Sequence, residues 1–292
     1  SHKIKTFNDG VEVGKCKNCN LIYTPKRHST PEDLFGEFSI DRLKIIYEPI
    51  LNGSKKHFRD KIFKKYLKKI KKYSSGNKHL DIGCAHGFFI DLANKEGFKV
   101  SGVEPNKIMA EFASEILNHK IYNGTLDEVE LKEKWDAISF TDSLEYFMNP
   151  IGDIQKLVNN NLNSNGVIFI KVPNGDYFVL RHLLQKIGLS FGGAQPFSPS
   201  KRVAHYNYNT INHLASKTEL KTVKRGFFEP INSPIWKKIT GVYLETKAPW
   251  WFGLKTKLTR KIIHYIGLTE FFLIKKNHFS QSVYIIMKKY KI

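Results

Sequence analysis

The sequence predicts an α/β protein built on a doubly wound, mostly parallel sheet of seven strands. Between residues 78 and 172, short apolar runs alternate with segments of helical spacing, which is typical of parallel strands joined by right-handed crossovers. At residues 79–89 an apolar run ends in a glycine-containing turn and a helix follows, the usual form of a ligand loop in such sheets. With 292 residues, 41% of them hydrophobic, the chain can bury one sizeable core and a small appendage.

The elements are expected in a regular order along the chain. We predict strands at residues 79–82, 98–103, 119–122, 135–140, 166–172, 220–227 and 280–287. We predict helices at residues 39–47, 54–73, 107–117, 150–162 and 210–217. The helix at 54–73 has apolar residues at three- and four-residue steps and lysines elsewhere, so it can pack on the sheet by one face.

The domain organisation follows from what surrounds this alternation. Residues 1–53 are expected to form an N-terminal appendage, with a hairpin and a connecting segment in which Tyr47 could face a ligand. Residues 54–292 form the main domain. Within it, residues 173–206 are rich in loop formers and aromatics after the fifth strand, which suggests a substrate lid. Residues 230–277 form a basic, aromatic insertion whose simplest structure is a helical pair on the flank of the domain.

The loop after the first strand reads Asp81-Ile82-Gly83-Cys84-Ala85-His86-Gly87. Gly83 and Gly87 lack a Cβ, so they can take positive φ and let a ligand approach the backbone. The spacing fits the G-x-G-x-x-G dinucleotide fingerprint poorly, and the G-K-[ST] of a Walker loop is absent. Glu104 ends the second strand, where a carboxylate can accept hydrogen bonds from ribose hydroxyls.

Together these segments resemble the class I S-adenosylmethionine (SAM)-dependent methyltransferases. The loop resembles their first motif, with Ala85 in place of the middle glycine. Residues 135–146 resemble their fourth strand and its Leu-Glu-His loop, with Tyr146 in place of the histidine, and residues 166–174 resemble the fifth strand. The resemblance covers roughly residues 55–292. It implies a Rossmann-like fold, SAM as cofactor and S-adenosylhomocysteine (SAH) as product.

The resemblance also implies which residues hold the cofactor. They lie in the glycine loop, after the second and third strands, and after the fourth strand, and they are Asp81, Gly83, Cys84, Ala85, Gly87, Phe88, Glu104, Pro105, Asn106, Gly124, Thr125, Leu126, Thr141 and Ser143.

Transfer to an alcohol also requires a base, because the pKa of a hydroxyl lies far above 7. The candidates are His205, Asp142 and Tyr146. His205 is the preferred one, since histidine titrates near neutrality and this one lies where the lid meets the next helix. A purely structural role, a hydrogen bond to the loop backbone, remains an alternative for His205.

Cys16-Lys17-Asn18-Cys19 has the spacing of half a zinc site, because two thiolates on one turn can occupy two corners of a tetrahedron. It resembles the second knuckle of the small zinc-binding region that precedes the catalytic domain in some bacterial sugar methyltransferases. The sequence contains no second pair, so we expect a hairpin with two free thiols and no metal. We expect a cytoplasmic protein for three reasons. The chain has only three cysteines, it has no apolar run of the roughly 18 residues that span a bilayer, and it shows no signal pattern.

The formal net charge of +20 favours anionic partners: nucleic acid, a phospholipid surface or a phosphorylated substrate. A solvated lysine coat needs no partner and is the alternative. The basic, partly apolar segments at 54–73 and 230–277 could also contact the inner face of an anionic membrane.

The acceptor class is narrowed by motifs that are absent. Methylation of base amino groups usually needs an Asn/Asp-Pro-Pro-aromatic loop, and methylation at pyrimidine carbon needs a cysteine nucleophile; neither follows the fourth strand. A nucleic-acid acceptor is therefore the weaker expectation. The combination of Leu144-Glu145-Tyr146, the late lid, the partial zinc knuckle and the basic insertion resembles bacterial methyltransferases of sugars and surface glycans. This resemblance implies O-methylation of a nucleotide-linked or lipid-linked sugar, as in bacterial capsule or lipopolysaccharide biosynthesis. The alternatives are methylation of RNA or another small molecule, and a non-catalytic module that binds through its basic surface if Ala85 cannot adopt the loop conformation.

Overall fold

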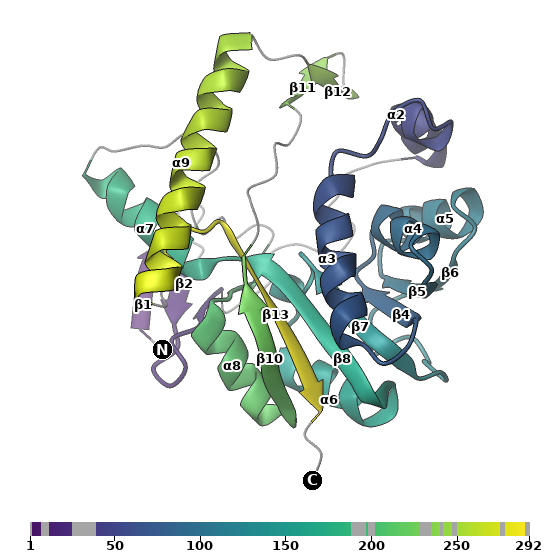
Figure 1. The fold of residues 1–292 in the computed structure, drawn as a ribbon, viewed down its shortest axis with the longest axis horizontal. Coiled ribbons are helices and arrows are strands. Elements are labelled where there is room, and N and C mark those ends of the chain that lie inside the picture. The colour runs from purple at the N-terminus through teal and green to yellow at the C-terminus, as the bar shows by residue number, and fades with distance from the viewer. Residues whose placement is uncertain are drawn as a thin grey trace.

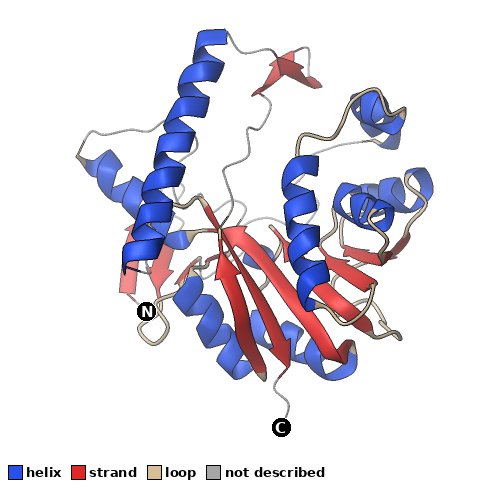
Figure 2. Ribbon diagram, in the orientation of Figure 1, coloured by secondary structure: helices blue, strands red, loops and turns tan. Residues whose placement is uncertain are grey.

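The computed structural model describes residues 2–6, 12–24, 39–187, 197, 202–227, 235–239, 242–246, 250–274 and 278–289. Figure 1 shows a twisted central sheet with helices packed around it, and Figure 2 shows the strands in red. Its seven strands have the order β10-β13-β8-β7-β4-β5-β6. Their bounds in that order are Leu220–Gly226, Ser282–Lys289, Leu162–Pro173, Trp135–Thr141, Lys78–Ile82, Lys99–Glu104 and Lys120–Asn123. This sheet confirms the predicted α/β fold.

The strands from β4 to β8 run parallel, and β13 enters antiparallel between β8 and β10. The register places Leu80 opposite Ser101 on one side and opposite Ile138 on the other. The carboxyl ends of β4, β5, β7 and β8 therefore meet at one edge of the sheet.

One face of the sheet is covered by α3 (Asp60–Tyr73) and α4 (Phe88–Lys95). The apolar side of α3 is buried as its periodicity predicted, including Tyr66 and Ile70. It packs against side chains of the strands such as Phe169, and Tyr66 and Phe169 lie with their ring centroids 5.5 Å apart. The lysines of α3 remain on the outside.

The opposite face is covered by α6 (Pro150–Asn160) and α8 (Tyr208–Lys217). Buried side chains of both helices share a cluster with the strands, including Leu157 and Leu214. Strands that are covered on both faces explain the continuous apolar runs in the sequence.

The segment after β5 differs from the predicted single helix. Asn106 caps α5 (Lys107–Glu111) by accepting a hydrogen bond from the Met109 N–H at 3.1 Å. A π-helical turn then follows at Phe112–Ile116. In this wider turn Phe112 is fully buried beneath α2 (Ile40–Leu51), where it shares a cluster with Leu43.

The N-terminal residues form a second sheet in the order β1-β2-β3-β9. Its strands are His2–Thr6, Glu12–Lys15, Ile22–Tyr23 and Ala204–His205. Ile22 pairs with His205, so the predicted appendage joins the end of the predicted lid. Cys16 and Cys19 lie in the turn after β2 as free thiols, and no cluster able to hold a metal occurs among the described residues.

The predicted lid and insertion contain more regular structure than expected. The lid includes α7 (Gly175–Lys186), and part of it lies outside the described residues. The insertion contains a hairpin, β11 (Ile235–Ile239) with β12 (Val242–Thr246), and one long helix, α9 (Trp250–Ile274), instead of a helical pair. Within the described part of the chain, no helix combines the length and apolarity needed to cross a membrane.

Candidate active site

A cavity of about 740 Å³ opens at the carboxyl ends of β4, β5, β7 and β8. All predicted cofactor residues line it except Gly87 and Asn106. Those that do are Asp81, Gly83, Cys84, Ala85, Phe88, Glu104, Pro105, Gly124, Thr125, Leu126, Thr141 and Ser143. The two exceptions lie at the starts of helices next to the cavity: Gly87 precedes α4, and Asn106 caps α5.

The glycine loop has three left-handed residues, Gly83 (φ +75°), Ala85 (φ +48°) and Gly87 (φ +78°). A Cβ on Gly83 would lie 2.6 Å from the Cβ of Ser143, and one on Gly87 would lie 2.8 Å from the Cβ of Ala113. Both positions therefore require glycine. Ala85 adopts the loop conformation in spite of its methyl group.

Glu104 joins the loop to the end of β5. Its carboxylate accepts the N–H of Ala85 at 2.8 Å and the N–H of Asn106 at 2.9 Å. Burial raises the pKa of Glu104 to about 6, although these two N–H groups lower it. Each oxygen keeps a second lone pair, so the carboxylate can still accept hydrogen bonds from a ligand in the cavity.

Asp81 is held by a buried chain of hydrogen bonds behind the loop. The Ser139 hydroxyl donates to Asp81 Oδ1 at 2.5 Å, and His79 Nε2 lies 2.8 Å from the same hydroxyl. Burial raises the pKa of Asp81 to about 8 and lowers that of His79 to about 3. A cationic ligand group beside Asp81 would favour its ionised form.

Aromatic rings cover the loop from the side of α2. The ring centroid of Tyr47 lies 4.7 Å from that of Phe88 and 5.2 Å from that of His86. All three residues line the cavity. Tyr47 therefore faces the ligand space, as its place in the sequence allowed.

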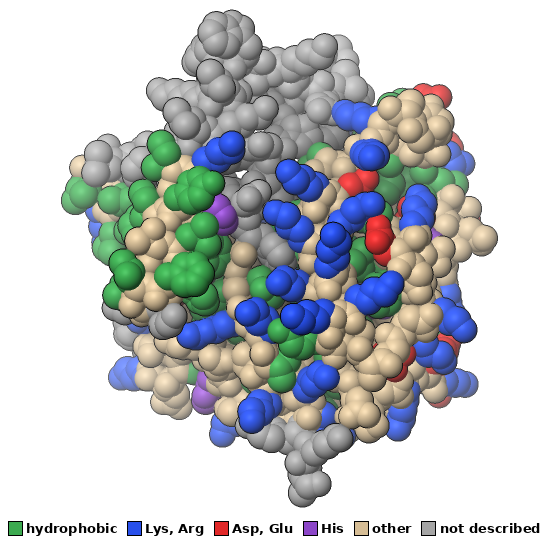
Figure 3. All heavy atoms as spheres, in the orientation of Figure 1, with side chains coloured by type: hydrophobic (Ala, Val, Ile, Leu, Met, Phe, Trp, Pro, Cys, Tyr) green, Lys and Arg blue, Asp and Glu red, His purple; other side chains and the backbone are tan. Residues whose placement is uncertain are grey.

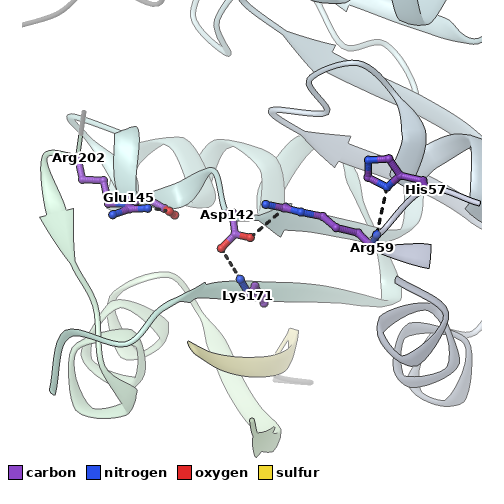
Figure 4. A network of polar contacts seen from close by, with 6 residues as sticks. All are labelled: His57, Arg59, Asp142, Glu145, Lys171 and Arg202. Carbon is purple, nitrogen blue, oxygen red and sulfur yellow. Dashed lines mark hydrogen bonds and ion pairs between the residues drawn. The ribbon is translucent and has the colours of Figure 1, made fainter. Parts of the chain in front are cut away.

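A cluster of charges forms the wall beyond the loop (Figure 4). The Asp142 carboxylate lies between Lys171 Nζ at 2.5 Å and the Arg59 guanidinium at 3.5 Å. Burial alone would raise the pKa of Asp142, but Lys171 and Arg59 outweigh it and hold the pKa below its usual value. Asp142 itself is left-handed, with φ +59°, and its N–H donates to the carbonyl of Lys171 at 2.8 Å. The backbone N–H of Arg59 donates a hydrogen bond to His57 Nδ1 at 3.4 Å, which helps to fix the main chain at Arg59.

Glu145 and Arg202 extend this wall (Figure 4). Glu145 is 1% exposed, and Arg202 Nε lies 3.5 Å from its Oε1. Neither carboxylate oxygen has a hydrogen-bond partner among the described residues. Burial raises the pKa of Glu145 to about 7, and the neighbouring Asp142 carboxylate adds to the shift.

The three predicted base candidates occupy different positions. Asp142 and Tyr146 line the cavity, whereas His205 does not. His205 is buried in β9, where it packs edge-on against Phe197 with the ring centroids 5.1 Å apart. Burial lowers the pKa of His205 to about 3 and raises that of Tyr146 to about 12. The reason for preferring His205, a titration near neutrality at the lid, therefore does not hold in this structure.

Sequence reasoning missed the cations of the charged wall. Lys171 carried a signal, because it interrupts the apolar run of β8, and a lysine in a doubly covered strand is rarely buried without a partner. Arg59 and Arg202 carried none, because each stands among other polar residues near a loop.

Comparisons with known proteins agree with this geometry. A family model described as a methyltransferase domain matches residues 56–224. Among curated proteins, no sequence matches the chain. Similar solved structures include a SAM-dependent methyltransferase from Clostridium acetobutylicum, at 11% identity and a TM-score of 0.50 over 86% of this chain and 99% of that one. Another is a SAM-dependent methyltransferase from Mesorhizobium loti, at 12% identity and a TM-score of 0.51 over 82% and 100%.

A third similar structure is magnesium protoporphyrin IX methyltransferase from Synechocystis with bound SAH, at 12% identity and a TM-score of 0.50 over 86% of this chain and 94% of that one. At such identities the likeness concerns the fold.

Proposed function

The chain belongs to the SAM-dependent methyltransferase family, and from this premise we propose that it methylates a hydroxyl of a sugar that carries phosphate, nucleotide-linked or lipid-linked. The observation that carries the proposal is the charged wall of the cavity. It presents three cations, Arg59, Lys171 and Arg202, to the cavity.

The residues around the loop fit SAM. Glu104 offers carboxylate oxygens where a ribose diol would be recognised, and the buried Asp81 suits the ammonium of the methionine portion. Thr141 Oγ1 is buried, lacks a hydrogen-bond partner among the described residues and lies in the cavity lining. Such an orphaned group is expected to find its partner on a ligand.

The charged wall suits an anionic acceptor. Its three cations face two carboxylates, Asp142 and Glu145, so the wall has a surplus of positive charge even when both are ionised. With a pKa of about 7, Glu145 is partly protonated near neutrality, which increases the surplus. Arginine forms paired hydrogen bonds with phosphate, which supports a phosphorylated acceptor rather than a neutral one.

Bound SAM supplies a methyl group that its sulfonium has already activated. The protein then has to align the acceptor hydroxyl and receive its proton, and alignment alone can supply several kcal/mol. Asp142 is the base candidate best placed for this, because its carboxylate lines the cavity and its side chain is 23% exposed. Its lowered pKa keeps it ionised at neutral pH.

The proposal is tested by methyl-transfer assays with matched acceptors: nucleoside-diphosphate sugars, the same sugars without phosphate, and tRNA. We expect transfer to the phosphorylated sugars. Arg202→Gln should raise KM for them at least about tenfold and leave SAH affinity unchanged, because the guanidinium lies beside Glu145 of the charged wall and over the Phe178 ring, and neither residue belongs to the glycine loop. Lys132→Gln is the control, since Lys132 is 76% exposed and outside the cavity lining.

Equal activity on the free sugars, or transfer to tRNA alone, would contradict the proposed acceptor. The non-catalytic alternative rested on Ala85 being unable to adopt the loop conformation, and Ala85 does adopt it.

A further inference from the structure

The second half of α9 turns an apolar face to solvent. Leu273 is 76% exposed, Phe272 68% and Tyr265 64%. Together with Ile262 and Ile266 they recur at three-, four- and seven-residue steps, so they share one side of the helix. We call these five residues the outer face of α9. A globular helix normally turns such a face inward.

The inner side of α9 fixes this orientation. The Phe271 ring packs against Phe227 with centroids 5.7 Å apart, and the Arg225 guanidinium lies 5.8 Å from the same ring. The Glu270 carboxylate contacts His278 Nδ1 at 2.5 Å and accepts the N–H of Phe279 at 3.3 Å. These contacts of the inner residues hold the helix to the domain. The outer face is therefore exposed because of the orientation in which the helix is packed.

Positive charge lies to one side of the outer face (Figure 3). Figure 3 shows hydrophobic side chains gathered over the lower part of α9, with Lys and Arg side chains beside them over α3 and the strands β10 and β13. Lys221 and Lys224 of β10 are exposed, as is Lys261 of α9. The whole chain has a formal net charge of +20.

We propose that the outer face of α9 docks on the surface of an anionic phospholipid membrane. Its apolar side chains would enter the boundary between headgroups and acyl chains, and the exposed lysines beside it would contact the phosphates. The charge decides between possible occupants, because a second copy of the chain would bring the same positive surface against itself. Docking here is independent of the cavity and of methyl transfer.

Vesicle sedimentation tests the proposal with the whole protein. Vesicles of phosphatidylcholine with about 30 mol% phosphatidylglycerol should bind the chain, and vesicles of phosphatidylcholine alone should bind it much more weakly. Binding should weaken as salt is raised from about 0.05 to 0.5 M, because salt screens the lysine contacts.

Two sets of variants separate the apolar and charged contributions. Phe272→Ser with Leu273→Ser should weaken partitioning to the anionic vesicles at least about tenfold, because two large apolar side chains are lost from the interface. Ile45→Ser is the matched control: Ile45 is 73% exposed, but on α2, and its loss should have no effect. Lys221→Glu with Lys224→Glu should weaken binding to anionic vesicles only. All replaced side chains are exposed, so an unchanged Tm is expected and is checked first.

Three results would overturn the proposal. The first is no binding of the wild type to anionic vesicles at low salt. The second is equal loss of binding in Ile45→Ser and in the α9 variant. The third is a dimer in analytical ultracentrifugation that the α9 variant abolishes, because the outer face would then be an interface between two copies of the chain.

Discussion

Glu104 joins the glycine loop to the segment after β5, because its carboxylate accepts the backbone N–H groups of Ala85 and Asn106. Because its pKa is about 6, the carboxyl gains a proton as the pH falls from about 8 to about 5 and loses acceptor capacity. We therefore predict that SAH affinity falls over this range. Calorimetric titrations across it check the prediction, and in Glu104→Gln the fall should disappear. A pH-independent affinity in the wild type would contradict this role.

We expect Asp81 to lower the stability of the folded protein and to increase its affinity for SAH. Burial raises its pKa above the value in the unfolded chain, so between about pH 4 and pH 8 the folded protein keeps a proton that the unfolded chain has lost, and stability declines as pH rises. Asp81→Asn removes this penalty and keeps an acceptor for Ser139. We predict a Tm raised by at least about 2 °C at about pH 7.5, the shift expected for roughly 1 kcal/mol in a chain of this size.

The same substitution should weaken SAH binding, because asparagine cannot pair with an ammonium group. Differential scanning fluorimetry and calorimetry on one preparation measure both effects. A lowered Tm together with unchanged SAH affinity would show that Asp81 has only a structural role.

Ala85 stores a small amount of backbone strain, because its φ of +48° is unfavourable for a residue with a Cβ. Ala85→Gly should keep SAH affinity and change the free energy of unfolding by less than about 1 kcal/mol, since relief of strain is offset by the greater freedom of glycine when unfolded. Ala85→Val should destabilise the loop and weaken SAH binding, because a β-branched residue fits positive φ poorly. Chemical denaturation and calorimetry compare the three proteins.

Among the elements, the pairing of β7 with β8 creates the charged wall. It places Thr141 opposite Lys171, so the next residue, Asp142, meets the lysine at the carboxyl end of both strands. Lys171→Met removes the largest cationic influence on Asp142 and should raise its pKa. We predict that the acidic limb of the kcat–pH profile moves up by about one unit or more. An unmoved limb would exclude Asp142 as the titrating base.

The elements show where sequence reasoning succeeds and where it fails. Most strands of the central sheet were predictable because they contain short apolar runs, such as residues 167–170, and α3 because its apolar residues repeat at helical steps. The π-turn at Phe112 and the pairing of Ile22 with His205 were not, since both depend on contacts between segments far apart in the chain. That pairing also explains why His205 is buried rather than catalytically exposed.

For the molecule as a whole, the alternation of strands and helices was enough to predict the sheet and the edge at which the cavity opens. The cavity lining around the glycine loop was largely predictable, because its residues follow successive strands in a fixed order. The charged wall was not, because Arg59, Lys171 and Arg202 come from three separate segments that only the folded sheet brings together. The net charge of +20 favours anionic partners but does not indicate where on the molecule they would bind.

The cavity is proposed to bind SAM through the glycine loop and Glu104. This proposal is tested most directly by calorimetric titration of SAH into the wild type, Glu104→Ala and the control Glu130→Ala, whose carboxylate is 78% exposed and outside the cavity lining. We predict micromolar binding that weakens at least about tenfold in Glu104→Ala and stays unchanged in the control. Absence of binding in the wild type, or equal affinity in all three proteins, would contradict the account.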